Sequence, residues 1–239
     1  MKGLLRCGSV AVSSPLLPSK LLYPSPFSPR AKTHLNWRKP VASASPSLVI
    51  ETSEGETTAK SMATRRLIIL RHAESSWNDR TIRDHDRLLS KTGRADAISV
   101  SCQLEQMGWV PELILSSDAK RTKETLQIMQ EHVQGFLEAE VHFIASFYSI
   151  AALDGQTAEH LKEAVCEYSK NDIFTVMCMG HNRGWEEAAS VFSGSPVELK
   201  TCNAALLEAS GESWDEAFTL NHRAGLGWPI ISELQESED

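Results

Sequence analysis

The stretch Leu67-Ile68-Ile69-Leu70-Arg71-His72 decides the fold class of this 239-residue chain. Four consecutive apolar residues, two of them β-branched, predict a buried strand. Arg71 and His72 therefore stand at the carboxyl end of that strand, where open α/β sheets bind their ligands. A second strand-like run, residues 173–179, ends in the same way at Gly180 and His181. Two strand ends that each deliver a histidine predict one pocket with two imidazoles and at least one guanidinium.

Short apolar runs alternate with amphipathic stretches along the rest of the body. Further strands are expected over residues 113–115, 141–144, 203–208 and 217–221, and helices over residues 90–107, 119–133, 157–168 and 185–192. The early strand-helix alternation predicts an α/β fold with a mainly parallel sheet and helices on both faces. The charged stretch 74–89 lacks a clear period and is interpreted as a long functional loop with one helical turn.

The N-terminal 60 residues differ in composition from the rest. The first 50 contain nine Ser, seven Lys or Arg and seven of the ten prolines, and the first acidic residue is Glu51. A serine-rich, basic and acid-free start is typical of an organelle transit peptide, here followed by a disordered linker. The proline content favours a chloroplast over a mitochondrial destination. We therefore expect a leader and linker over 1–60, a domain over 64–225 and an irregular acidic tail over 226–239.

The charge balance and the cysteines limit the partners of the body. The first 50 residues carry +7, so the remaining chain carries −14. Such an acidic body does not favour nucleic-acid binding, and the apolar runs are too short to span a membrane. No Cys-x-x-Cys pair occurs and neither histidine has a carboxylate or second histidine at ligand spacing, so we expect no metal and no cofactor. The oligomeric state is left open.

The expected pocket suits a phosphoryl group. A neutral imidazole, as His72 is expected to be at cellular pH, can displace a leaving group from phosphorus and give a phosphohistidine that water then hydrolyses. Arg71 and Arg121 are the expected phosphate clamp, because a guanidinium donates two hydrogen bonds and keeps its charge. Arg121 lies one turn into a helix that begins at a strand end. His181 can donate to a phosphate oxygen and stabilise charge in the transition state.

The general acid is the open point of this chemistry. Glu74, Asp84 and Asp86 lie in the loop that follows the first strand, and any of them could approach the leaving group. Asp79 shares that loop, and further options lie elsewhere in the chain: Glu112, Glu124, Asp154 and Glu159. A P–N substrate would need little help from an acid, because its leaving imidazole can be protonated beforehand, whereas an alkyl phosphate would need a positioned acid.

Three separated motifs, in order, resemble the histidine phosphatase superfamily, also called phosphoglycerate mutase-like. Residues 70–78, LRHAESSWN, resemble the motif RHGETxWN, with Ala73 at the usual glycine. Residues 116–125, SSDAKRTKET, are similar to SSPxxRAxxT, with Asp118 at the proline. Residues 180–184, GHNRG, resemble GHNPG. In addition, residues 84–93, DHDRLLSKTG, resemble DxxRPLTxxG of the SixA-like phosphohistidine phosphatase branch.

This resemblance implies a three-layer α/β/α sandwich over about residues 65–222. It implies that His72 is phosphorylated, that Arg71, Arg121 and His181 complete the site, and that Asn78 helps to hold phosphate. The segment between Arg121 and His181 is short, so the inserted lid of mutases is absent from the pattern. A compact, SixA-like enzyme favours a phosphorylated protein as substrate, with a small phosphate ester as the other option. The alternatives are phosphoglycerate mutase-type transfer and a non-catalytic module that binds phosphate or a phosphoprotein.

Overall fold

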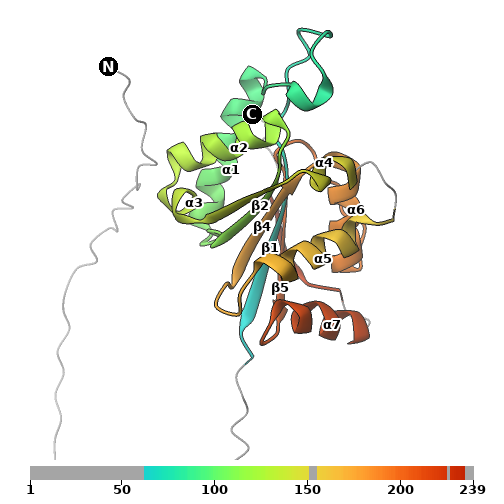
Figure 1. The fold of residues 1–239 in the computed structure, drawn as a ribbon. Coiled ribbons are helices and arrows are strands. Elements are labelled where there is room, and N and C mark those ends of the chain that lie inside the picture. The colour runs from blue at the N-terminus through green and yellow to red at the C-terminus, as the bar shows by residue number, and fades with distance from the viewer. Residues whose placement is uncertain (1–61, 151–154, 225–226, 235–239) are drawn as a thin grey trace, which may run out of the picture. The chain divides into compact units, whose positions relative to one another are not determined.

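A computed structural model describes residues 62–150, 155–224 and 227–234. Its centre is a six-stranded sheet in the order β3-β2-β4-β1-β5-β6 (Figure 1). The strands are β1 Thr64–Arg71, β2 Leu113–Ser117, β3 Glu140–Ile144, β4 Thr175–Gly180, β5 Ala204–Ser210 and β6 Ile230–Leu234. The four strands β3, β2, β4 and β1 are parallel, and β5 and β6 pair antiparallel at one side. The predicted α/β class with a mainly parallel sheet is confirmed.

Helices cover both faces of the sheet, so the architecture is the expected three-layer α/β/α sandwich. The helices are α1 Lys91–Gln106, α2 Lys120–His132, α3 Gln134–Glu138, α4 Ser146–Ile150, α5 Thr157–Tyr168, α6 Asn182–Ser193 and α7 Trp214–Ala224, with a 3-10 turn, η1, at Asp84–Asp86. Helices α1, α2 and α3 lie on one face, and α4, α5, α6 and α7 lie on the other (Figure 1). Each face has its own apolar core.

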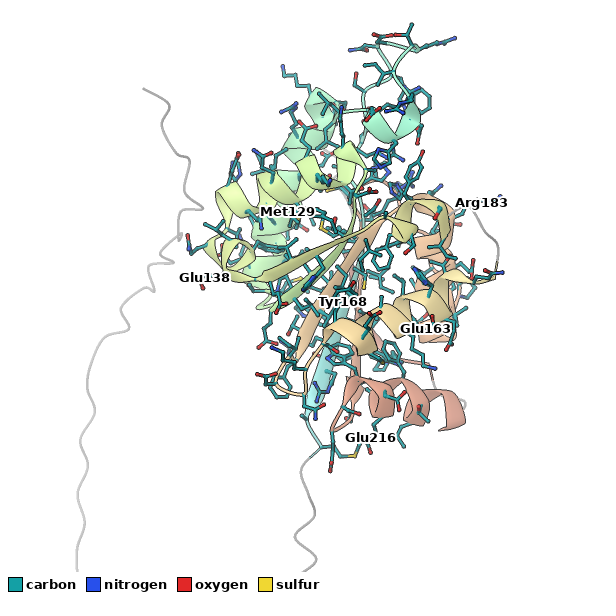
Figure 2. All side chains as sticks on the ribbon, viewed as in Figure 1. Met129, Glu138, Glu163, Tyr168, Arg183 and Glu216 are labelled. Atoms are coloured by element: carbon teal, nitrogen blue, oxygen red, sulfur yellow. The ribbon has the colours of Figure 1, made fainter. Side chains whose placement is uncertain are left out.

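Alternation along the buried strands builds these two cores. Leu67 and Ile69 of β1 face the α5–α6 side, whereas Ile68 and Leu70 face the α1–α2 side. All four side chains are completely buried. Met129 of α2 packs in the second core, and the outer helix surfaces carry acids such as Glu138 of α3 and Glu163 of α5, both labelled in Figure 2. Each helical layer therefore carries exposed acidic side chains on its outer side.

Parallel pairing brings the two histidine-bearing strand ends together. Strand β1 pairs with β4 in a register that sets Arg71 opposite Gly180. The backbone N–H of His72, one residue past the strand, donates to the Gly180 carbonyl oxygen at 3.0 Å. His72 and His181 therefore leave the same edge of the sheet from neighbouring strands. The 3-10 turn η1 lies in the loop 74–89, as expected.

Two local predictions at the C-terminal side are wrong. Residues 217–221, predicted as a strand, belong to helix α7, whose apolar side chains at Trp214 and Phe218 follow a helical step. Residues 230–234, predicted as part of an irregular tail, form β6 and pair with β5. The packed elements thus continue beyond the predicted domain end at residue 225. The short helices α3 and α4 have no counterpart among the predicted elements, and the leader and linker expected over 1–60 lie outside the described residues.

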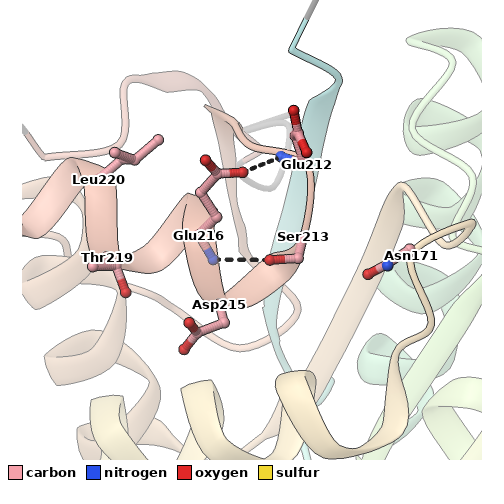
Figure 3. Close-up of a pocket in the computed structure, with 7 residues that line it drawn as sticks. All are labelled: Asn171, Glu212, Ser213, Asp215, Glu216, Thr219 and Leu220. Atoms are coloured by element: carbon pink, nitrogen blue, oxygen red, sulfur yellow. Dashed lines mark hydrogen bonds between the residues drawn. The ribbon is translucent and has the colours of Figure 1, made fainter.

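A hollow of roughly 520 Å³ opens at the opposite end of the sheet from the two histidines. Figure 3 shows its lining, which comes from the loop before β4, the turn before α7 and α7 itself: Asn171, Glu212, Ser213, Asp215, Glu216, Thr219 and Leu220. Two hydrogen bonds within it join Glu216 to the turn before the helix. No helix within the described ranges has the length and apolarity needed to cross a lipid bilayer.

Gly180 is required by close packing at the end of β4. A Cβ added there would lie 2.2 Å from Cζ2 of Trp185, a side chain that is completely buried and donates to the Cys178 carbonyl oxygen at 3.0 Å. Gly180→Ala should therefore destabilise the fold by about 1–3 kcal/mol, the usual cost of overpacking. Urea unfolding measures this cost. In a Trp185→Phe background the added cost should shrink, because the clashing ring is smaller; an undiminished cost would contradict this explanation.

Candidate active site

His72 is held in one ring orientation by two hydrogen bonds. The residue is 7% exposed and directly follows β1. Its Nδ1 lies 2.7 Å from the Ala73 carbonyl oxygen, and its Nε2 lies 3.0 Å from Nε of Arg121. The guanidinium can only donate, so Nε2 accepts and Nδ1 carries the proton. The Nε2 lone pair therefore faces the guanidinium of Arg121.

His181, 8% exposed, occupies the N-cap position of helix α6 immediately after β4. Its Nδ1 accepts from Nη2 of Arg121 at 3.1 Å. Its Nε2 must then carry the proton, and it lies 2.8 Å from Oγ of Ser117, at the end of β2. The ring centroids of His72 and His181 are 5.1 Å apart. The two imidazoles thus converge on one guanidinium, and three neighbouring strand ends supply the site.

Arg121 is the centre of this arrangement. It is 6% exposed and lies in the first turn of α2, so its side chain returns to the sheet edge where β2 ends. Besides the two imidazoles, it binds Asp84 twice, through Nη1 to the backbone carbonyl oxygen at 2.6 Å and through Nη2 to Oδ2 at 3.0 Å. The side chain therefore uses donors on all three of its nitrogens within the site.

Arg71 lies beside this cluster without a hydrogen bond to either imidazole in the described structure. Its Nη1 donates to the Leu199 carbonyl oxygen at 2.7 Å, and its buried Nε has no partner. Burial lowers the pKa of Arg71, an effect that the nearby Glu186 opposes and the nearby Arg121 reinforces. Glu186 also accepts from the Leu199 backbone N–H, so both charged side chains hold the same loop residue. The Arg71 guanidinium is thus half-buried and keeps donor capacity.

Burial keeps both imidazoles neutral. It lowers the pKa of His72 to about 4; the hydrogen bond to Ala73 opposes the shift, and the charges of Arg121 and Arg71 add to it. Burial likewise lowers the pKa of His181 to about 2, and His72 and Arg121 reinforce the shift. With both rings neutral, the cationic groups of the site are Arg121, which is paired with the Asp84 carboxylate, and Arg71, which keeps donor capacity. Guanidinium donors beside two neutral rings are suited to bind a further anion.

Only one of the three predicted acids enters the cluster. Asp84 accepts from Arg121 and, at 3.0 Å, from the hydroxyl of Tyr148. Burial works to raise its pKa, but the charge of Arg121 and the two hydrogen bonds outweigh that effect, so the pKa of Asp84 lies below its ordinary value. Its carboxyl is therefore ionised at neutral pH.

The other predicted loop residues point elsewhere. Asp86 binds Arg83 and Lys120, and the hydrogen bond from Arg83 holds its pKa below the usual range. Glu74 and Asn78 are exposed. Among the described residues, neither side chain has a recorded hydrogen bond to the imidazoles or to Arg121. The structure thus brings together five of the eight predicted site residues: Arg71, His72, Asp84, Arg121 and His181.

Sequence reasoning misses three side chains around this cluster. Ser117 is absent from the predicted site residues, and Tyr148 lies in the unpredicted helix α4. His85 binds Asp118 through Nε2 at 3.0 Å and meets the Tyr148 ring edge-on at 4.9 Å. The paired serines at the end of β2 are the available signal, because successive side chains of a strand point to opposite faces of the sheet, so a hydroxyl stands on either face at this strand end.

No group of three or more His, Cys, Asp or Glu side chains within the described ranges is arranged to hold a metal ion. The donors around His72 and His181 are instead two guanidiniums and a hydroxyl. Such donors bind oxyanions.

The fold and this arrangement define the class of protein: the chain belongs to the histidine phosphatase superfamily. The family model for branch 1 of that superfamily matches residues 67–174, which include His72 and Arg121. Its fold is similar to that of SixA structures. Both the recognition of the family and the fold that it implies are confirmed.

Among individual relatives, an Arabidopsis thaliana protein described as uncharacterized and chloroplastic is 66% identical over 161 residues, which cover 67% of this chain and 74% of the relative. A candidate SixA phosphohistidine phosphatase from Agrobacterium tumefaciens has the same fold, with 24% identity and a TM-score of 0.55 over 72% of this chain and 98% of the other. A SixA structure complexed with tungstate gives 15% identity and a TM-score of 0.54 over 71% and 96%.

The depressed pKa values predict how stability depends on pH. An unfolded histidine titrates near ~6.5, so below that pH the unfolded chain binds protons that the folded His72 and His181 do not. The free energy of unfolding that the two neutral rings contribute is fully present above pH 6.5. It is lost as the pH falls toward 4, by up to ~1.4 kcal/mol per pH unit for each ring. The free energy of unfolding of His72→Asn/His181→Asn should fall less steeply than that of the wild type between pH 6.5 and 4.5, by about 2 kcal/mol per unit. Equal slopes in urea titrations would contradict neutral rings.

Ser117 should accept the Nε2 proton of His181 that Arg121 fixes on that nitrogen. Ser117→Ala removes the one partner of Nε2 among the described residues, so the tautomer should stay while the ¹⁵N chemical shift of Nε2 in labelled histidine changes. Ser116→Ala is the matched control, because the buried Oγ of Ser116 bonds only the neighbouring Ser117 carbonyl oxygen within the described ranges. An unchanged His181 spectrum in Ser117→Ala, or an equal change in both variants, would contradict this role.

Proposed function

We propose that this protein is a metal-independent phosphatase in which His72 is the nucleophile and a phosphohistidine is the intermediate. The observation that carries the proposal is a neutral His72 whose Nε2 lone pair faces the guanidinium of Arg121. Membership of a phosphatase superfamily supports the same reaction class. The four side chains Arg71, His72, Arg121 and His181 are the proposed catalytic set.

In the first step, Nε2 of His72 attacks phosphorus and the leaving group departs on the opposite side. Arg121 then turns donors from the two imidazoles to the equatorial oxygens, where guanidinium groups stabilise developing charge. Arg71 is the second clamp, since its Nε is unpaired. His181 can donate from Nδ1 only after it gains a proton, and a bound phosphoryl group favours that protonation. In the second step, water attacks phosphorus and releases His72 and phosphate.

Asp84 is the proposed proton-transfer group. Its ionised carboxyl is suited to accept a proton from the attacking water in the second step rather than to protonate a leaving group in the first. This favours substrates whose leaving group needs no protein acid, such as phosphohistidine. Glu74 and Asp86 are not needed in this scheme, and Asn78 is proposed to contact substrate only if the loop closes toward His72.

A phosphorylated protein is the proposed substrate, with a small phosphate ester as the second option. The name of the tungstate complex describes that relative as a protein histidine phosphatase. Localisation is proposed to be the chloroplast, because the serine-rich, basic N-terminus has that character and the Arabidopsis relative is described as chloroplastic. That description does not favour the mitochondrial alternative. No nucleic acid or membrane partner is part of the proposal.

The test is to trap the intermediate. Wild-type protein incubated with a phosphohistidine peptide should form an acid-labile, alkali-stable phosphoenzyme, and His72→Ala should form none and lose roughly 10³-fold or more in turnover. His132→Ala is the matched control, because His132 ends α2 and, among the residues that the structure describes, bonds only the Ile128 carbonyl oxygen. A phosphoserine peptide should turn over more slowly than the phosphohistidine peptide. Equal turnover of His72→Ala and wild type would refute the proposal.

A further inference from the structure

Arg87 is a buried guanidinium for which the described structure records no side-chain hydrogen bond. The residue is 7% exposed, and its Nε and Nη1 are buried without a partner. The ring of Trp77 covers the guanidinium, with Cζ 3.8 Å from the ring centroid. A buried donor without an acceptor destabilises the folded state. We therefore expect the two unpaired donors of Arg87 to find a hydrogen-bond acceptor when the proposed active site changes, for example when it binds an anion.

The nearest anion to Arg87 is the carboxylate that already binds Arg121. Oδ1 of Asp84 lies 3.6 Å from Nε of Arg87, just beyond hydrogen-bond distance, whereas Oδ2 lies 3.0 Å from Nη2 of Arg121. One carboxylate thus stands between two guanidiniums and is bonded to one of them. A movement of less than an ångström toward Arg87 would satisfy its Nε.

The backbone around Asp84 is fixed, so the side chain can move alone. The Asp84 carbonyl oxygen accepts from Nη1 of Arg121 at 2.6 Å and from the backbone N–H of Arg87 at 3.3 Å. The turn η1 is a 3-10 helix and Arg87 is its C-cap. Residues three apart in a 3-10 helix lie on the same side, one above the other. Asp84 can therefore turn from one guanidinium to the other within the same backbone.

We propose that the Asp84 carboxylate passes from Arg121 to Arg87 when a phosphoryl group binds Arg121, and that Arg87 is a positioning residue of the site. The inference rests on the proposed function only in placing the phosphoryl group on Arg121. Nη2 of Arg121 binds both His181 and Oδ2 of Asp84, so a phosphoryl oxygen that replaces the imidazole at Nη2 would lie beside this carboxylate, and their like charges repel. Arg87 supplies the displaced carboxylate with a cation and two unused donors.

The burial of Arg87 favours Asp84 over the substrate as its partner. The two unpaired nitrogens are buried, and the indole of Trp77, itself 64% exposed, lies between the face of the guanidinium and solvent. A substrate group would have to displace Trp77, whereas Oδ1 of Asp84 already lies 3.6 Å from Nε of Arg87. Retention of Asp84 near the site also keeps this carboxylate available for the proton transfer proposed above.

The experiment is a double-mutant cycle on the affinity for inorganic phosphate, measured by isothermal titration calorimetry at pH 7. The four proteins are the wild type, Asp84→Asn, Arg87→Met and the double variant. Asp84→Asn should bind phosphate about tenfold more tightly, because the competing carboxylate is gone. Arg87→Met should bind about tenfold more weakly, because the carboxylate then has no alternative to Arg121. In the Asp84→Asn background, Arg87→Met should change the affinity by less than about threefold.

The coupling between the two positions decides the outcome. A tenfold coupling corresponds to about 1.4 kcal/mol. If Arg87→Met weakens binding equally in both backgrounds, Arg87 acts on the anion itself and the transfer is wrong. If it weakens binding in neither background, the transfer is also wrong. Lys91→Met, a loss of an exposed cation at the start of α1, controls for the general effect of charge.

Two further controls separate this inference from its premises. If Arg87→Met does not unfold cooperatively in urea, Arg87→Gln takes its place, because glutamine keeps most of the length and loses the charge. Phosphate binding is measured without turnover, so the cycle gives a result even when no phosphoenzyme forms. Failure of the phosphatase proposal appears as a missing phosphoenzyme in the wild type, whereas failure of this inference appears as a missing coupling in proteins that bind phosphate.

Discussion

The site depends on one guanidinium that joins three segments far apart in the chain. Arg121 of α2 binds the imidazole that follows β1, the imidazole that follows β4 and the carboxylate of Asp84 in the loop between β1 and α1. Parallel pairing places the strand ends side by side, but pairing alone does not orient side chains. The planar set of donors on Arg121 does so, because each acceptor must lie near the plane of the group. Both imidazoles lie against this guanidinium and are largely buried, and their burial keeps them neutral.

The sequence is sufficient for the part of the fold that rests on periodicity and strand ends. The apolar run before Arg71 predicts β1, and the glycine before His181 marks the end of β4. Both Ser90 and Thr92 suit the start of α1 by sequence, and the structure selects Ser90, whose Oγ accepts from the Gly93 N–H. The two histidines and two arginines are predicted to lie together for the same reason, because parallel strands deliver their ends to one edge.

The rest depends on tertiary contacts that no local pattern shows. The apolar content of residues 217–221 suits either a strand or a helix. In the helical conformation Trp214 and Phe218, four residues apart, both pack against Trp228. Strand β6 is short and follows a glycine-rich stretch, so only its pairing with β5 defines it. Among the acids of the loop, proximity to Arg121 selects Asp84. That selection depends on how η1 sits over α2, which the spacing of Asp84 and Asp86 in the sequence cannot distinguish.

The bond between Nδ1 of His72 and the Ala73 carbonyl oxygen has a chemical consequence of its own. It ties one ring nitrogen to the main chain of the following residue, so only the other nitrogen is free to react. A phosphorylated form of this protein would therefore consist of a single regioisomer, with the P–N bond at Nε2. The two isomers of this modification differ in hydrolytic lifetime, so the persistence of the modified state is set by a backbone carbonyl that takes no part in the chemistry.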